Sequence, residues 1–261
     1  MTKNFPASFL KDCEKDYGIN FAIALHQLTD WAIHIDWGTL DDSLPIDKMI
    51  LLRAYVANNI DDVYDFTGIY KIKSYTEKIA TRLQNKVGLP VLTRFHNEND
   101  IRNSGRYGSL VSDKKIKEAR NVITKNISYL QKITKRNNKH IPVVDAMNLT
   151  YGKCMIFTYA KMIVQEKTPI MIISEEFTKG SEFEGNIPGF VHAVSFISED
   201  TMEDVWGKQS LMTILKRFGV SKYQLIDSKE EFLKSIESLK SSNPKLFDDF
   251  YSKSLQYIKD E

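Results

Sequence analysis

The stretch that decides the fold reads Tyr151-Gly152-Lys153-Cys154-Met155-Ile156-Phe157-Thr158-Tyr159-Ala160, in which a cysteine opens an apolar run with helical spacing. Two β-like runs and a short acidic segment follow it, namely Pro169-Ile170-Met171-Ile172-Ile173, Val191-His192-Ala193-Val194-Ser195-Phe196 and Glu203-Asp204-Val205-Trp206-Gly207. Three reactive side chains therefore occur in the order Cys154, His192, Asp204. A thiol at a helix start lies at the positive end of the helix dipole, so a nucleophilic thiolate is expected there.

A polar turn separates the histidine from the aspartate. The turn is Ser198-Glu199-Asp200-Thr201, and a hairpin at this point would bring His192 and Asp204 roughly opposite each other. The carboxylate could then orient the imidazole. Taken alone, Cys154 is more typical of a buried apolar position than of a nucleophile, and the ordered His192 and Asp204 shift the interpretation toward catalysis. Cys13 has no such partners and is interpreted as structural.

The composition limits the classes of protein to consider. The 261 residues include 42% hydrophobic residues and carry a net charge of +2, which is typical of a globular protein and gives no general attraction to nucleic acid. Two cysteines make no disulfide framework, and the charged segment 1–17 does not resemble a signal peptide, so a cytoplasmic protein, or one delivered into a host cytoplasm, is expected. No apolar run approaches the roughly 20 residues that span a bilayer. The sequence contains no glycine-rich phosphate loop or metal-ligand motif, so neither a cofactor nor a metal is expected.

The chain contains a second, earlier version of the same pattern. The matched positions are Tyr17-Gly18-Ile19-Asn20 with Tyr151-Gly152-Lys153-Cys154, Arg53 with His192, Asp65 with Asp204, and Gly68 with Gly207. In both versions the aspartate lies twelve residues after the matched strand residue and three residues before the glycine. The helix start lies 33 residues before Arg53 but 38 before His192, and the difference falls in the loop 175–189, where insertion is tolerated. The spacing predicts two tandem units, 1–135 and 140–261, joined by the basic segment 132–140. Within the segment 88–140, a polar loop is expected around residues 97–108 and a charged helix over about 113–135.

The first version lacks two of the three reactive groups. Asn20 stands in the place of the thiol and Arg53 in the place of the imidazole, while Asp65 remains. Neither an amide nor a guanidinium can act as a nucleophile or shuttle a proton at neutral pH, so the first unit is predicted to be noncatalytic. Arg53 is expected to form a structural salt bridge with Asp65. Asn20 is expected to cap its helix and to donate to the same cluster.

The order of cysteine, histidine and aspartate before Trp-Gly resembles the papain-like cysteine peptidase superfamily, especially its compact bacterial and phage toxin or effector branches. The resemblance covers about residues 148–215. It implies an α+β fold of two tandem papain-like units, each with a nucleophile-type helix packed on an antiparallel sheet. By the same resemblance, Cys154 is the nucleophile, His192 the general base and acid, and Asp204 the orienting carboxylate. Asn148 matches the oxyanion-hole amide, where the family more often has glutamine.

Two classes of function remain open from the sequence. The first is a thiol hydrolase that acts on amide bonds of a protein substrate, either a protease or a glutamine deamidase. The second is a noncatalytic papain-like protein that binds or inhibits a protein partner, and in which Cys154 is retained without a catalytic role. Both classes imply a protein substrate or partner.

Overall fold

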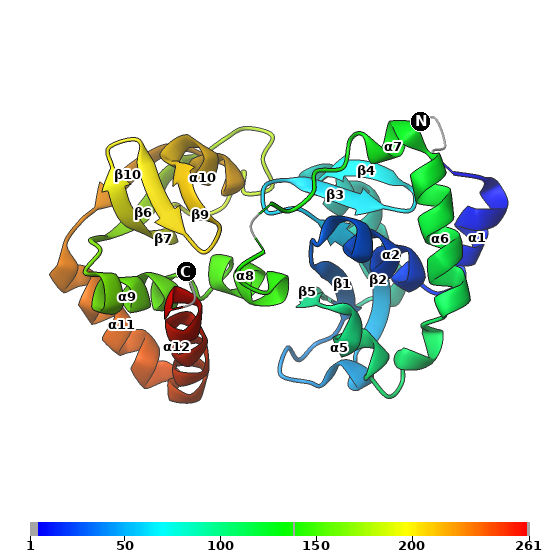
Figure 1. Ribbon diagram of the computed structural model, residues 1–261, viewed down its shortest axis with the longest axis horizontal. Coiled ribbons are helices and arrows are strands. Elements are labelled where there is room, and N and C mark those ends of the chain that lie inside the picture. The colour runs from blue at the N-terminus through cyan, green and yellow to red at the C-terminus, as the bar shows by residue number, and fades with distance from the viewer. Residues whose placement is uncertain (1–4, 138, 260–261) are drawn as a thin grey trace. The chain divides into compact units, whose positions relative to one another are not determined.

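Two antiparallel five-stranded sheets form the framework of the structure, a computed structural model that describes residues 5–137 and 139–259. The chain divides after Asn137 into two compact α+β units, each containing one of the sheets (Figure 1). The division falls within the basic segment 132–140. In the part of the chain that the structure describes, no helix has both the length and the apolar character required to cross a bilayer.

The first unit is built around a sheet with the strand order β4-β3-β2-β1-β5. Its strands are β1 (Ile33–Gly38), β2 (Ile50–Ala57), β3 (Asp62–Asp65), β4 (Gly68–Lys71) and β5 (Val91–His96). Its helices are α1 (Ala7–Lys15), α2 (Ile19–Thr29), α3 (Ile72–Tyr75), α4 (Thr81–Val87), α5 (Glu98–Arg102), α6 (Asp113–Lys125) and α7 (Ile127–Leu130). The short elements η1 (Ile46–Lys48), η2 (Thr76–Ala80) and η3 (Gly108–Leu110) complete this unit.

The second unit has a sheet with the strand order β10-β6-β7-β8-β9. Its strands are β6 (Pro169–Phe177), β7 (Gly189–Ser198), β8 (Thr201–Asp204), β9 (Gly207–Ser210) and β10 (Val220–Ile226). Its helices are α8 (Val143–Thr150), α9 (Cys154–Gln165), α10 (Leu211–Arg217), α11 (Lys229–Ser242) and α12 (Pro244–Lys259).

The two units share one topology. In each, a buried helix precedes four consecutive antiparallel strands, helical residues follow the fourth strand, and the fifth strand returns to pair with the first. The matched residues also share a register, since Asp65 pairs with Gly68 across β3 and β4, and Asp204 pairs with Gly207 across β8 and β9. The repeated spacing in the sequence therefore corresponds to a repeated arrangement of strands.

The helices α2 and α9 lie at the centre of their units because they are apolar on more than one side. In α2 every residue from Ile19 to Leu25 is buried. In α9 the buried side chains contact Met171 and Ala193 of the sheet as well as Phe232 of α11 and Phe247 of α12, in one hydrophobic cluster. The first residue of α9 is therefore held firmly against the sheet.

Two features of the first unit differ from the sequence interpretation. The segment 88–140 was expected to contain only loop and helix, but its apolar residues form the edge strand β5, which pairs with β1. The charged helix expected over 113–135 ends at Lys125, because the Asn126 side chain accepts a hydrogen bond from the Tyr129 N–H and begins the separate helix α7.

A tight approach between Gly18 and β2 provides a test of the fold. Gly18 has φ +83°, and a Cβ atom there would lie 2.7 Å from the carbonyl oxygen of Ala54. Gly152, its match in the second unit, has φ +102°, and a Cβ there would have nothing within 4 Å. We expect Gly152→Ala to cost about 1 kcal/mol from the positive φ alone, and Gly18→Ala on the order of 3 kcal/mol. Urea unfolding of both variants measures the difference, and equal losses would contradict this account of α2 packing.

Candidate active site

Cys154, His192 and Asp204 come together because α9 begins beside the hairpin of β7 and β8. Cys154 is the first residue of α9, His192 lies in β7, and Asp204 ends β8. The Trp206 indole N–H, just past β8, donates to the hydroxyl of Thr150 at 2.7 Å and so fixes the end of α8 near this hairpin. All three reactive side chains are buried, and His192 is 0% exposed.

The carboxylate of Asp204 is fully engaged. Its Oδ2 lies 3.2 Å from His192 Nε2, and its Oδ1 accepts from the Trp206 backbone N–H at 2.8 Å. Arg217 Nη1 donates to Oδ2 at 2.5 Å, and Gln209 Nε2 donates to Oδ1 at 2.9 Å. A buried carboxylate with so many donors stays ionised and cannot rotate freely.

The environment shifts the pKa of both titratable partners. Burial raises the pKa of Asp204, but the Arg217 charge and then the His192 ring outweigh it and lower the pKa to about 2. Burial lowers the pKa of His192, but the charge of the nearby Cys154 and the hydrogen bond with Asp204 raise it to about 9. An imidazolium therefore persists at neutral pH. The stabilising effect of this imidazolium is complete below 6.5, the ordinary pKa of histidine, and is lost as the pH rises through about 9.

The two ring nitrogens of His192 differ in their contacts. Nε2 lies beside Asp204, whereas Nδ1 has no hydrogen-bond partner within the described residues, so Nδ1 is the ring nitrogen left for Cys154. The ring of Phe218 lies 4.7 Å from the imidazole, between centroids, and shields it from water. This arrangement can hold a thiolate next to an imidazolium, which is the reactive state of a cysteine nucleophile.

Asn148, which was expected to donate a hydrogen bond to the oxyanion, lies in α8, and its side chain is hydrogen-bonded to other groups. Its side-chain amide donates to the Val144 carbonyl at 2.9 Å, and its oxygen accepts from Lys153 Nζ at 3.4 Å. An oxyanion role for Asn148 would therefore require its second N–H or another rotamer. The first two backbone N–H groups of α9, those of Cys154 and Met155, need no rearrangement, because the first turn of a helix leaves such groups without i−4 partners. The N–H of Ile156 already donates to the Lys153 carbonyl at 3.1 Å.

The sequence interpretation missed Arg217 and Gln209. Arg217 follows Ile214 by three residues, so it lies on the same buried face of α10. An arginine on the apolar face of a short helix signals a buried cation that needs an anion, and this signal was present in the sequence. Gln209 carries no comparable signal, because it is one of several polar residues on the edge strand β9.

The equivalent place in the first unit holds the expected salt bridge. Arg53 Nε donates to Asp65 Oδ2 and Arg53 Nη2 donates to Asp65 Oδ1, both at 2.8 Å. The guanidinium carbon lies 3.6 Å from the ring centroid of Phe66, and Thr67 adds a backbone N–H bond of 2.7 Å to the same carboxylate. The pair is bidentate and largely buried, which makes its geometry specific.

The expected contribution of Asn20 to this cluster was wrong. Asn20 is the second residue of α2, whose N-cap is Gly18, so it does not cap the helix. Its amide donates to Asp16 at 2.8 Å and to the Leu110 carbonyl at 2.9 Å, and its oxygen accepts from the Ser112 N–H at 2.8 Å. Asn20 therefore connects α2 to the loop before α6. The amide nitrogen and the oxygen of its side chain are both bonded to these groups, so neither is directed at the Arg53–Asp65 pair.

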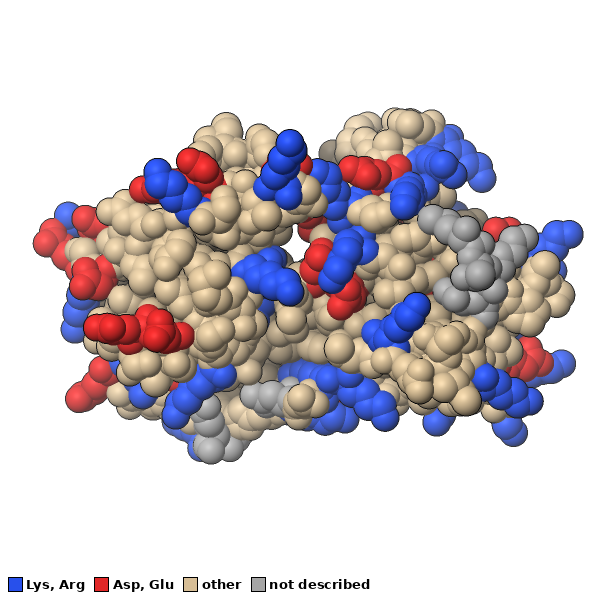
Figure 2. Space-filling model, turned by 90° about the horizontal axis from the view of Figure 1, so that it is seen from above, with Lys and Arg blue, Asp and Glu red and all other residues tan. Residues whose placement is uncertain are grey.

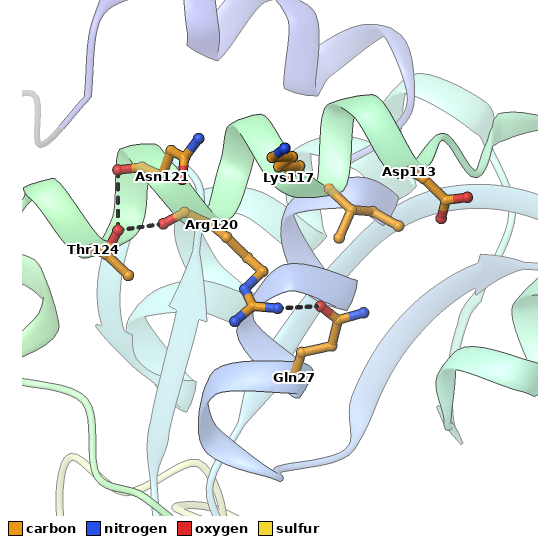
Figure 3. A pocket seen from close by; sticks show the side chains of 7 residues that line it. Gln27, Asp113, Lys117, Arg120, Asn121 and Thr124 are labelled. Atoms are coloured by element: carbon orange, nitrogen blue, oxygen red, sulfur yellow. Dashed lines mark hydrogen bonds between the residues drawn. The ribbon is translucent and has the colours of Figure 1, made fainter.

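Two of the cavities lined by described residues lie in the first unit, and neither contains the groups of a nucleophilic site. A groove of about 510 Å³ lies between α2 and α6 (Figure 3), lined by Gln27, Asp113, Ile116, Lys117, Arg120, Asn121 and Thr124. Arg120 donates to Gln27 across it at 3.4 Å. A cavity of about 350 Å³ lies beside β4, lined partly by Thr67, Gly68, Lys71, Lys78 and Lys132. Within the described ranges no cluster of three or more acidic, histidine or cysteine side chains could hold a metal ion.

Comparisons with protein-family models, with curated proteins and with solved structures found no match to this chain. The surface in Figure 2 adds no strong charge signal, because basic and acidic side chains are interspersed over the face shown. The geometry around Cys154 is therefore the main guide to function.

The salt bridge of the first unit leads to a second test. We expect Arg53→Ala to lower the free energy of unfolding by about 3 kcal/mol, because it leaves Asp65 buried without its cation. The control Arg102→Ala removes two more exposed pairs, with Glu98 and with Asp113, and should cost less than about 1 kcal/mol. Thermal and urea unfolding measure both. Alkylation of Cys154 in the folded fraction should not change, and its loss without a change in melting temperature would contradict the separation of the two sites.

Proposed function

We propose that this chain is a thiol hydrolase acting on amide bonds of a protein substrate. Cys154 is the nucleophile, His192 the general base and acid, and Asp204 the orienting carboxylate. The observation that carries the proposal is the buried His192, whose Nε2 lies 3.2 Å from Asp204 while Nδ1 has no hydrogen-bond partner among the described residues and is left for Cys154. The pKa of His192 is raised to about 9, which agrees with a charged neighbour on both sides of the ring.

A purely structural role for His192 accounts less well for these contacts. Buried histidine–aspartate pairs also occur as structural ion pairs. In this unit, however, Asp204 already has a permanent cation in Arg217 at 2.5 Å. A second buried cation is not needed to neutralise the carboxylate, and burying one is costly. The remaining partner of the imidazolium is Cys154, whose thiolate would balance its charge.

The proposed reaction follows from these positions. The Cys154 thiolate attacks the amide carbonyl carbon, and the resulting oxyanion accepts hydrogen bonds from N–H groups at the start of α9. His192 donates its proton to the leaving nitrogen as the C–N bond breaks, which leaves a thioester. Water then attacks the thioester while His192 takes its proton, and the C–S bond breaks to release the acid and restore the thiolate.

The papain-like interpretation extends to the whole chain as part of the proposal. Its support is a helix packed on an antiparallel sheet in both units, with the nucleophile position at the start of that helix in the second. In the first unit Asn20 and Arg53 occupy the matched positions, so we infer a noncatalytic copy that supports the second unit or recruits its substrate. Peptide-bond cleavage and glutamine deamidation use the same three groups, and both remain within the proposal.

Thiol alkylation tests the proposal with an internal control. Cys13 and Cys154 are 6% and 5% exposed, so access is similar. Burial, followed by the charges of Asp16 and Asp65, raises the pKa of Cys13 to about 12, whereas Cys154 faces a cation. At pH 7 we expect iodoacetamide to modify Cys154 at least about tenfold faster than Cys13, and His192→Ala to remove this difference. Peptide mapping by mass spectrometry measures both rates.

Equal, slow modification of the two thiols would contradict the hydrolase and favour the noncatalytic binding protein. If Cys154 is reactive, incubation of host proteins with the unaltered chain and with Cys154→Ala identifies the reaction. New protein termini indicate a protease, whereas mass shifts at glutamine indicate a deamidase. The Cys154→Ala sample reports changes that do not depend on the nucleophile.

A further inference from the structure

We infer that Arg217 is a positioning residue of the active site. The permanent positive charge of Arg217 neutralises Asp204, so that the positive charge of His192 remains available to stabilise the thiolate of Cys154. The inference rests on the proposed hydrolase function and assigns a role to a residue outside the group of cysteine, histidine and aspartate.

Arg217 belongs to a ring of hydrogen bonds that fixes the carboxylate. Its side chain is 0% exposed, and Nη1 donates to Asp204 Oδ2 at 2.5 Å while Nη2 donates to Gln209 Oε1 at 2.6 Å. Gln209 in turn donates to the other carboxylate oxygen at 2.9 Å. The three side chains come from β8, β9 and α10, and together they hold both oxygens of Asp204. As a result Oδ2 stays directed at His192 Nε2, 3.2 Å away.

The first unit shows what happens when this arginine is absent. Arg217 lies ten residues after Gly207, and the residue at the same distance after Gly68 is Lys78. Lys78 is exposed and lines the cavity beside β4. Asp65 instead takes its cation from Arg53, at the position matched to His192. In the unit without the helix arginine, the strand position supplies the counter-ion and carries no imidazole.

The charges around the site explain why the two roles must be separated. Asp204 is faced by His192 from β7, Gln209 from β9 and Arg217 from α10, while His192 is also faced by Cys154 from α9. With Arg217 present, two cations balance two potential anions. Without it, Asp204 and Cys154 would compete for the single charge of His192. Either Asp204 would take up a proton or it would hold the imidazolium for itself, and Cys154 would lose reactivity in both cases.

The experiment measures the pH dependence of Cys154 alkylation in Arg217→Gln and Arg217→Lys, with circular dichroism to establish the folded fraction. At pH 7 we expect Arg217→Gln to lower the rate at least tenfold. The acid limb of its profile should move up by about one pH unit, because a carboxyl without its cation takes up a proton more readily. Arg217→Lys retains a cation and should recover part of the rate. Lys216→Gln makes the same change of charge at an exposed position on α10 and should alter neither rate nor profile.

Each result supports or overturns the inference. A folded Arg217→Gln variant with an unchanged rate and acid limb overturns it, whereas a lower rate with a shifted limb supports it. If Arg217→Gln does not fold, Gln209→Ala removes one arm of the same ring, and an unchanged acid limb in that variant also overturns the inference. A reactive unaltered chain with insensitive variants refutes this inference alone. An unaltered Cys154 no more reactive than Cys13 refutes the proposed function and this inference with it.

Discussion

A buried carboxylate at the end of a short strand is the constraint on which both units depend. Asp65 ends β3 and Asp204 ends β8, and both side chains are almost completely removed from water. A carboxylate in that position is strongly destabilising unless a cation and several donors surround it. In both units a backbone N–H two residues further along the chain supplies one donor, from Thr67 or Trp206. The units differ in which element supplies the cation, and this difference separates a structural site from a candidate catalytic one.

The element that supplies the cation determines which side chain the neighbouring strand can place beside the aspartate. Arg53 is itself on the strand β2, so the bidentate pair occupies the space where an imidazole would stand, and its guanidinium cannot exchange protons at neutral pH. Arg217 is instead on α10 and approaches Asp204 from another side. The strand β7 is then free to present His192, a group that titrates, to both Asp204 and Cys154. The same topology thus supports a rigid salt bridge in one unit and, in the other, a buried histidine to which we assign proton transfer in the proposed reaction.

The sequence was sufficient for features set by local spacing and insufficient for those set by packing. The repeated distances around Asp65 and Asp204 indicated the repeated strands, and the chemistry of a guanidinium beside a carboxylate indicated the Arg53–Asp65 pair. Asn20 was misinterpreted because its hydrogen-bond partners at residues 110 and 112 are about ninety positions away and carry no side-chain signal. The edge strand β5 was missed because its alternation of apolar and polar residues is irregular. Arg217 was missed because its partner is defined by where α10 packs.

The dependence on the cation also explains why the first unit cannot acquire the arrangement of the second through one substitution. Replacing Arg53 with histidine would remove the cation of Asp65. The residue matched to Arg217 is Lys78, which is exposed and lines the cavity beside β4. Asp65, which also accepts from the Thr67 N–H, would then take the new imidazolium as its counter-ion, and the charge of that imidazolium would no longer be available to a thiolate. A thiol in place of Asn20 would in addition break the bonds that tie α2 to the loop before α6. In the proposed mechanism the counter-ion must be in place before the imidazole can serve a nucleophile, so the proposal makes the helix arginine a requirement of the site and not an accessory to it.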